Sequence, residues 1–193
     1  MLSKKFRKKL NPFAERIGLL LLKLKLTPNF ITFLGFVLIF PALYFFYFKN
    51  IFLASIFILL SGLMDVLDGA LARVSKTTRL GEYLDAVTDK MVEGLIFLGV
   101  GFSFPEFWPL ACLGVLSSIL VSYTKHRVDK FNINNSVAGL ERAERILILG
   151  FGILFSYFLP DPEFFVLIVL LFVIIGSFTT SLFQIFKAVK LLK

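Results

Sequence analysis

The sequence has very little of the two residue types that most often bind transition metals. It contains one cysteine, Cys112, and one histidine, His126, in 193 residues. A single cysteine excludes an intrachain disulfide, and its apolar neighbours favour a packing role. A lone histidine excludes a multi-histidine site and argues against zinc. Any metal site must therefore use carboxylates, which suit Mg²⁺ or Mn²⁺.

Charged residues are also scarce, and apolar residues take their place. The chain is 58% hydrophobic, carries 25 phenylalanines and has a mean hydropathy of +0.86. This is too apolar for an ordinary soluble domain. Because a membrane span needs about 20 mostly apolar residues, the chain has room for about six spans and little else. We expect an all-α membrane protein.

The charge-poor stretches predict six transmembrane helices, near residues 28–48, 50–72, 81–103, 107–124, 141–159 and 164–186. Six spans place both termini on one side of the membrane, and every lysine and arginine except Lys49 then falls on that side. The positive-inside rule makes it the cytoplasmic side of the plasma membrane. The net charge of +8 is therefore attributed to topology and anionic lipid rather than to nucleic acid.

The segment before the first predicted span is basic but carries an apolar stripe at helical spacing. The stripe consists of Phe6, Leu10, Phe13, Ile17, Leu20, Leu21 and Leu24. Such a pattern predicts an amphipathic helix lying on the membrane surface, although a simple basic tail is the alternative. We therefore divide the chain into an interfacial helix at 1–26 and a six-helix domain at 27–193.

The second predicted span ends in a stripe of acidic, small and basic residues. Its members, at offsets of 0, 3, 4, 7 and 8 along a helix, are Asp65, Asp68, Gly69, Ala72 and Arg73. These offsets place all five on one face. The small residues would let a nucleotide approach the helix backbone closely, and the arginine could donate to a phosphate.

The third predicted span opens with Gly81, Asp85 and Asp89 at offsets of 0, 4 and 8, which again share one face. If the two faces oppose each other, four carboxylates converge. Acidic side chains at membrane depth are costly unless they are paired or bind cations, so the cluster predicts divalent metal for phosphoryl transfer. Each part also has an alternative reading. The acids could form a proton or cation relay, Gly69 and Ala72 could serve close helix packing, and Arg73 could be a positive charge that only sets the membrane orientation.

The combined pattern, D-x-x-D-G-x-x-A-R, seven residues, then G-x-x-x-D-x-x-x-D, resembles the signature of the CDP-alcohol phosphatidyltransferase family. That family displaces CMP from a CDP-linked lipid with the hydroxyl of a small alcohol. The resemblance implies a homodimer that uses two divalent metal ions, Mg²⁺ or Mn²⁺. It assigns Asp65, Asp68 and Asp85 to the metals, while Asp89 completes the second metal site and acts as general base.

The resemblance also implies where the CDP-lipid binds. On the acidic stripe and beyond it, the contacts would come from Gly69, Ala72, Arg73 and Thr78. The segment Pro28, Asn29, Phe30, Ile31 and Thr32 resembles the family's P-N-x-x-T and would border the nucleotide. A helix start, with Thr27 as cap and Pro28 in the first turn, is a compatible structural reading.

Two further segments bear on the acceptor alcohol. Ser122-Tyr-Thr-Lys125-His-Arg127 and Gly139-Leu-Glu-Arg142-Ala-Glu-Arg145 resemble the S-Y-x-K-A-R and G-x-x-E-R-x-E-R segments of the inositol-phosphate branch. That branch contains the phosphatidylinositol phosphate and archaetidylinositol phosphate synthases. The resemblance implies inositol 1-phosphate as acceptor, with Lys125, Arg127, Arg142 and Arg145 around its phosphate. Topology alone also explains positive residues here.

Other readings stay open at this point. Glycerol 3-phosphate or serine could be the acceptor on the same scaffold. A cation or proton transporter would also use an acidic cluster, but it needs a polar path to both faces, and the acids lie near one end only. Diacylglycerol and archaeol donors are not distinguished. We interpret Glu93 as an i, i+3 ion-pair partner of Lys90.

Overall fold

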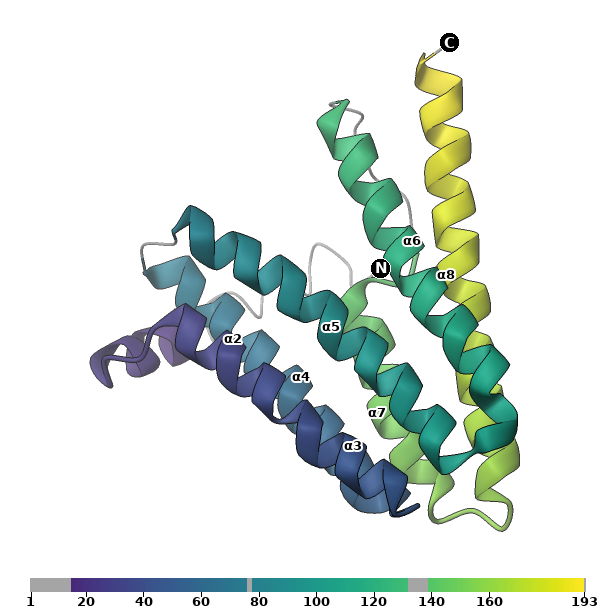
Figure 1. Ribbon diagram of the computed structural model, residues 1–193. Helices are drawn as coiled ribbons and strands as arrows, with labels where there is room; N and C mark the ends of the chain where they lie inside the picture. The colour runs from purple at the N-terminus through teal and green to yellow at the C-terminus, as the bar shows by residue number, and fades with distance from the viewer. Residues whose placement is uncertain (1–14, 76–77, 132–138, 193) are drawn as a thin grey trace.

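The computed structural model describes residues 15–75, 78–131 and 139–192, and these residues form helices and short connections, with no strand among them (Figure 1). Residues 15–23 are helical. The further elements are α2 (Pro28–Val37), α3 (Ile39–Tyr47), α4 (Ile51–Val74), α5 (Arg79–Ser103), the 3-10 turn η1 (Pro105–Phe107), α6 (Trp108–Lys130), α7 (Arg142–Ser156) and α8 (Pro162–Leu192). The predicted all-α class is confirmed.

Local sequence signals explain where these helices begin. The Thr27 hydroxyl accepts the backbone N–H of Phe30 and Pro28 opens α2, as the sequence predicts. Thr78 caps α5 in the same way, accepting from the Gly81 N–H at 3.0 Å. α7 begins with a reciprocal capping box between Glu141 and Glu144. Capping side chains at their own N-termini therefore set the residues at which α2, α5 and α7 begin.

The helices run up and down in alternation (Figure 1). α2 and α3 form a single rod, interrupted at Leu38, that packs on α4, and α4 in turn packs on α7. α5 bridges the α2–α4 group to α6, and α6 packs along α8. This alternation brings the starts of α2, α5 and α7 to the same end of the bundle as the ends of α4, α6 and α8. Both aspartate segments lie at that end.

Within the part of the chain that the structure describes, four helical stretches are long and apolar enough to cross a membrane: Pro28–Tyr47, Ile51–Val74, Pro105–Lys130 and Pro162–Leu192. Many large apolar side chains face outward, such as Phe155 at 63% exposure and Phe172 at 58%. A surface of this kind belongs in lipid. α5 carries too many charges, and α7 has only 15 residues, so six spans stay a prediction.

The described part of the N-terminal segment is helical at residues 15–23, while residues 1–14 of the predicted stripe lie outside the described residues. Gly18 is buried against the end of α4. A Cβ atom at Gly18 would lie 2.4 Å from the Ala70 carbonyl oxygen and 2.8 Å from Val74. Only glycine permits this approach. The segment therefore packs on the bundle; its position at a membrane surface stays a prediction.

The apolar core fills the half of the bundle away from the aspartates. It is built from all the long helices and includes Ile39, Phe46, Ile58, Phe97, Leu149 and Leu170, each fully buried. Close packing there leaves the other half to hold polar side chains and cavities.

Candidate active site

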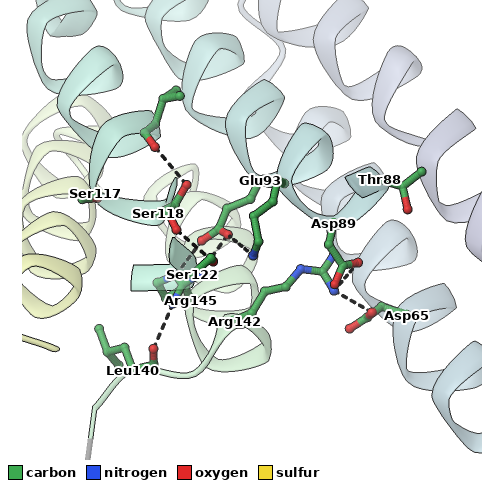
Figure 2. A network of polar contacts seen from close by, with 12 residues as sticks. Asp65, Thr88, Asp89, Glu93, Ser117, Ser118, Ser122, Leu140, Arg142 and Arg145 are labelled. Carbon is green, nitrogen blue, oxygen red and sulfur yellow. Dashed lines mark hydrogen bonds and ion pairs between the residues drawn. The ribbon is translucent and has the colours of Figure 1, made fainter. Parts of the chain in front are cut away.

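The site is built around the acidic faces of α4 and α5. One carboxylate oxygen from each of Asp65, Asp68 and Asp85 lies within 4.8 Å of the others. The fourth aspartate, Asp89, is joined to Asp65 through Arg142, whose Nη1 lies 2.7 Å from Asp89 Oδ1 and 2.5 Å from Asp65 Oδ1 (Figure 2). The structure thus brings three aspartates together directly and the fourth through an arginine.

These three aspartates suit a hard divalent cation. Asp85 Oδ1 is buried and has no hydrogen-bond partner among the described residues. Asp68 is only 6% exposed, and its Oδ2 accepts a hydrogen bond from the Thr32 hydroxyl at 2.8 Å. Several carboxylate oxygens gathered without histidine or cysteine form the donor set that Mg²⁺ or Mn²⁺ prefers. Repulsion among them would be relieved by a cation.

A cavity of about 340 Å³ lies on one side of the aspartates, between the start of α2, the end of α4 and the start of α5. Six of the residues expected to bind the CDP-lipid line it, namely Pro28, Asn29, Thr32, Gly69, Ala72 and Thr78. A Cβ added at Gly69 would have no neighbour within 4 Å, so the missing side chain widens the cavity. We call this space the donor cavity.

Three expected CDP-lipid residues do not line the donor cavity. Ile31 is buried at 3% exposure and Phe30 is 53% exposed on the outside. Arg73 is exposed, and its Nε–H donates to the Gly69 carbonyl at 2.9 Å. Their roles as contacts remain predictions.

Leu22 and Leu26, on the segment that docks through Gly18, complete the apolar wall of the donor cavity. Sequence reasoning missed this pair, because the predicted stripe emphasised Leu20, Leu21 and Leu24. The signal was Gly18, whose place in a leucine-rich segment marks a close helix contact.

A second cavity, of about 470 Å³, lies on the other side, between α5, α6, α7 and α8. Three of the four residues expected around the acceptor phosphate line it: Lys125, Arg142 and Arg145. Asp65, Asp85 and Asp89 form its acidic edge, and Asp85 lines the donor cavity as well. We call this space the acceptor cavity.

Arg127, the fourth expected phosphate ligand, is not brought into the acceptor cavity. It is exposed on the other side of α6, where its Nε–H donates to the Tyr123 hydroxyl at 3.0 Å and its guanidinium lies 5.1 Å from the Tyr123 ring centre. It lines instead an apolar groove between the ends of α6 and α8. Residues two apart on a helix point in different directions, which separates Arg127 from Lys125.

Two other residues near the acceptor cavity escaped the sequence prediction in part. Lys90 lines the cavity and lies 3.8 Å from Glu93, which is the expected ion pair. The shorter contacts of Glu93, however, are with Arg145, at 2.5 and 2.9 Å (Figure 2). No local pattern reveals a pair whose members are 52 residues apart.

The family model for CDP-alcohol phosphatidyltransferases matches residues 25–186, which include both aspartate segments, the whole lining of the acceptor cavity and the lining of the donor cavity except Leu22. The chain belongs to this family. The predicted membership is therefore confirmed, and the chain is a membrane transferase of the CDP-alcohol type.

Relatives within the family share much of this chain. An archaetidylinositol phosphate synthase of Pyrococcus horikoshii is 36% identical over 158 residues, which cover 81% of this chain and 84% of the relative. A second synthase of that name, from Methanothermobacter thermautotrophicus, is 30% identical over 90% of this chain and 85% of its own length. A phosphatidylinositol phosphate synthase of Streptomyces avermitilis is 31% identical over 91% and 75%, respectively.

Solved structures of family members have the same fold. The Mycobacterium tuberculosis phosphatidylinositol phosphate synthase with CDP-DAG bound superposes with a TM-score of 0.74 at 27% identity, covering 90% of this chain and 92% of that one. The same enzyme in complex with manganese and citrate gives a TM-score of 0.76, covering 90% and 88%.

Proposed function

We propose that this chain transfers a phosphatidyl-type group from a CDP-linked lipid, either CDP-diacylglycerol or CDP-archaeol, to the hydroxyl of inositol 1-phosphate. CMP is the second product. The choice of acceptor is supported by relatives that are archaetidylinositol phosphate or phosphatidylinositol phosphate synthases. The donor is supported by the neighbour structure that binds CDP-DAG.

The observation that carries this proposal is the wall shared by the two cavities. Asp85 lines both, so a donor on one side and an acceptor on the other meet at the same carboxylate group. The donor cavity has the small residues that admit a nucleotide pyrophosphate, whereas the acceptor cavity has the cations that a phosphorylated alcohol requires. Both volumes fall within the usual range for small-molecule sites.

The residues divide the work as follows. Asp65, Asp68 and Asp85 would hold two divalent ions, Mg²⁺ or Mn²⁺, with Asp89 completing the second site. When bound, such ions neutralise charge on the pyrophosphate and acidify a coordinated hydroxyl. Thr32 holds Asp68 in place through its hydrogen bond.

In the transfer step, Asp89 accepts the proton of the acceptor hydroxyl. The freed oxygen bonds to the lipid-linked phosphorus, the bond from that phosphorus to the CMP oxygen breaks, and CMP leaves with the bonding electrons. Lys125, Arg142 and Arg145 bind the phosphate of the acceptor and orient its hydroxyl. Gly69, Ala72 and Thr78 border the CDP group.

The same proposal covers the setting of the enzyme. Under this proposal, residues 1–26, which are helical at 15–23 where the structure describes them, are an interfacial segment, and residues 27–193 are a six-helix domain in the plasma membrane. Both termini and the active site face the cytoplasm, because the lysines and arginines gather at that end. The enzyme works as a homodimer, as the family resemblance implies.

The test is CMP release by purified protein with each CDP-lipid and a panel of acceptors. We expect turnover with inositol 1-phosphate and loss of turnover on addition of a chelator. Preference for glycerol 3-phosphate or serine would replace the acceptor but keep the reaction class. Cation flux in liposomes without any CMP release would favour a transporter and overturn the proposal.

A further inference from the structure

α5 and α7 are joined by two successive arginine–carboxylate contacts (Figure 2). The outer contact links Arg142 to Asp89, whose side chains are 17% and 20% exposed. One helical turn deeper, Arg145 meets Glu93, and these side chains are 1% and 0% exposed. The outer contact can exchange with solvent or substrate, whereas the inner one is buried at the wall of the acceptor cavity.

The inner contact fixes the guanidinium of Arg145 completely. Its Nε–H and an Nη2–H donate to the two carboxylate oxygens of Glu93, at 2.5 and 2.9 Å, and an Nη1–H donates to the Leu140 carbonyl at 2.9 Å. A guanidinium has five N–H groups, so one remains on each terminal nitrogen. Arg145 also lines the acceptor cavity.

The folding stability of the bundle does not explain why the buried Arg145–Glu93 pair is present. A buried ion pair usually contributes no more stability than well-packed apolar side chains of similar volume. Its place beside the acceptor cavity offers a reason. The Lys90 ammonium, which lines the same cavity, lies 3.8 Å from Glu93 Oε2, so one buried carboxylate holds two of the cavity's cations.

We propose that Glu93 is a positioning residue for the anionic group of the acceptor. Glu93 does not touch the substrate. It holds the Arg145 guanidinium in one orientation and keeps Lys90 at the cavity wall. The phosphate of the acceptor alcohol therefore meets N–H groups that are already aligned for hydrogen bonding. Alignment before binding avoids the entropy cost of ordering long side chains in the complex. This inference rests on the proposed function in placing the acceptor phosphate in this cavity.

The decisive experiment changes Glu93 alone, with Glu93→Gln, which removes the negative charge but leaves Arg145, the proposed phosphate ligand, in place. If Glu93 served only the stability of the bundle, this substitution would lower the melting temperature but leave the KM values for both substrates within twofold of the wild type. We expect instead that the KM for inositol 1-phosphate rises at least tenfold, while that for the CDP-lipid stays within twofold. Unchanged KM values for both substrates would overturn the proposal.

A milder variant, Glu93→Asp, decides the matter should Glu93→Gln fail to fold. It keeps the negative charge but withdraws the carboxylate from the Arg145 guanidinium. It should raise the acceptor KM several-fold and leave the donor KM unaltered, and equal changes in both KM values would contradict the proposal. Glu163→Gln, a carboxylate removal at the opposite end of the bundle, is the matched control.

The acceptor panel separates this inference from the proposed function. If the wild type prefers glycerol 3-phosphate, the proposed acceptor is wrong, but an acceptor-only KM change would still support Glu93. If the wild type uses inositol 1-phosphate well and the variants show no acceptor-only change, the role of Glu93 is wrong and the proposed function stands. A wild type that uses only serine overturns both, because serine brings no phosphate to this cavity.

Discussion

The donor and acceptor cavities share Asp85 but are lined by side chains of different chemistry. The donor cavity is lined mainly by small, neutral or apolar side chains, among them Gly69, Ala72 and Leu22. The acceptor cavity is lined by the cations Lys90, Lys125, Arg142 and Arg145. A bulky CDP-lipid needs space and close access to the helix backbone, whereas a small phosphorylated alcohol needs positively charged side chains around its phosphate. The contrast indicates that the two substrates are recognised independently.

The largest effect is expected at the proposed general base, Asp89, which lies on the acidic edge of the acceptor cavity. Asp89→Asn removes the proposed base while keeping the shape of the side chain, so the turnover number should fall by about 10²–10⁴-fold. CDP-lipid binding should persist, because Asp89 does not line the donor cavity. Single-turnover CMP release and a separate CDP-lipid binding assay would measure the two effects, and near-normal turnover would refute the assignment.

The acceptor cavity should respond next most strongly to loss of charge. A hydrogen bond to a charged group is worth about 1.5–3 kcal/mol, so Lys125→Ala should raise the KM for inositol 1-phosphate by roughly 10–100-fold. The KM for the CDP-lipid should not change. Initial rates with each substrate varied in turn would show whether the effect is confined to the acceptor.

The donor cavity should respond to bulk rather than to charge. Gly69→Val places a branched side chain where a Cβ has no neighbour within 4 Å, so folding should not suffer while the space for the nucleotide shrinks. We expect about a tenfold higher KM for the CDP-lipid, which corresponds to about 1.4 kcal/mol. A thermal melt would confirm the fold, and an equal rise in the acceptor KM would contradict the separation.

A smaller effect is expected where the N-terminal segment docks. Gly18→Leu forces this segment away from Ala70, since overpacking costs about 1–3 kcal/mol, and Leu22 and Leu26 then leave the donor cavity wall. The KM for the CDP-lipid should rise a few fold, with the acceptor KM unchanged. Gly18→Ala is the graded control, and cross-linking of residue 22 to α4 would report on docking.

The smallest effect is expected at Arg127. Because its side chain points away from the acceptor cavity and packs on Tyr123, Arg127→Ala should change the acceptor KM by less than about twofold, within the range of an exposed pair. A loss comparable to that of Lys125→Ala would restore Arg127 to the phosphate site. The two variants should be measured side by side.

Spacing along single helices predicted much of the site, because a helix fixes which residues share a face. Asp65 with Asp68, and Gly69 with Ala72, needed no tertiary information. The same reasoning separates Lys125 from Arg127, and Thr32 from its neighbours Phe30 and Ile31.

Contacts between distant helices could not be predicted in this way. The pairing of Glu93 with Arg145, and the bridge from Arg142 to both Asp65 and Asp89, depend on how α7 lies against α4 and α5. Local propensity carries no information on that placement. The charges that make the site also lower the hydropathy of α5, so composition does not identify this helix as a span.

The wall at Asp85 also bears on the order of events. Because the Asp85 carboxylate lines both cavities, the CDP-lipid and the alcohol can be bound at the same time. The phosphatidyl-type group can then pass directly from one to the other, without a covalent intermediate on a residue of the chain. Reciprocal plots of initial rate should therefore intersect rather than run parallel. Labelled CMP should not exchange into the CDP-lipid until the alcohol is added.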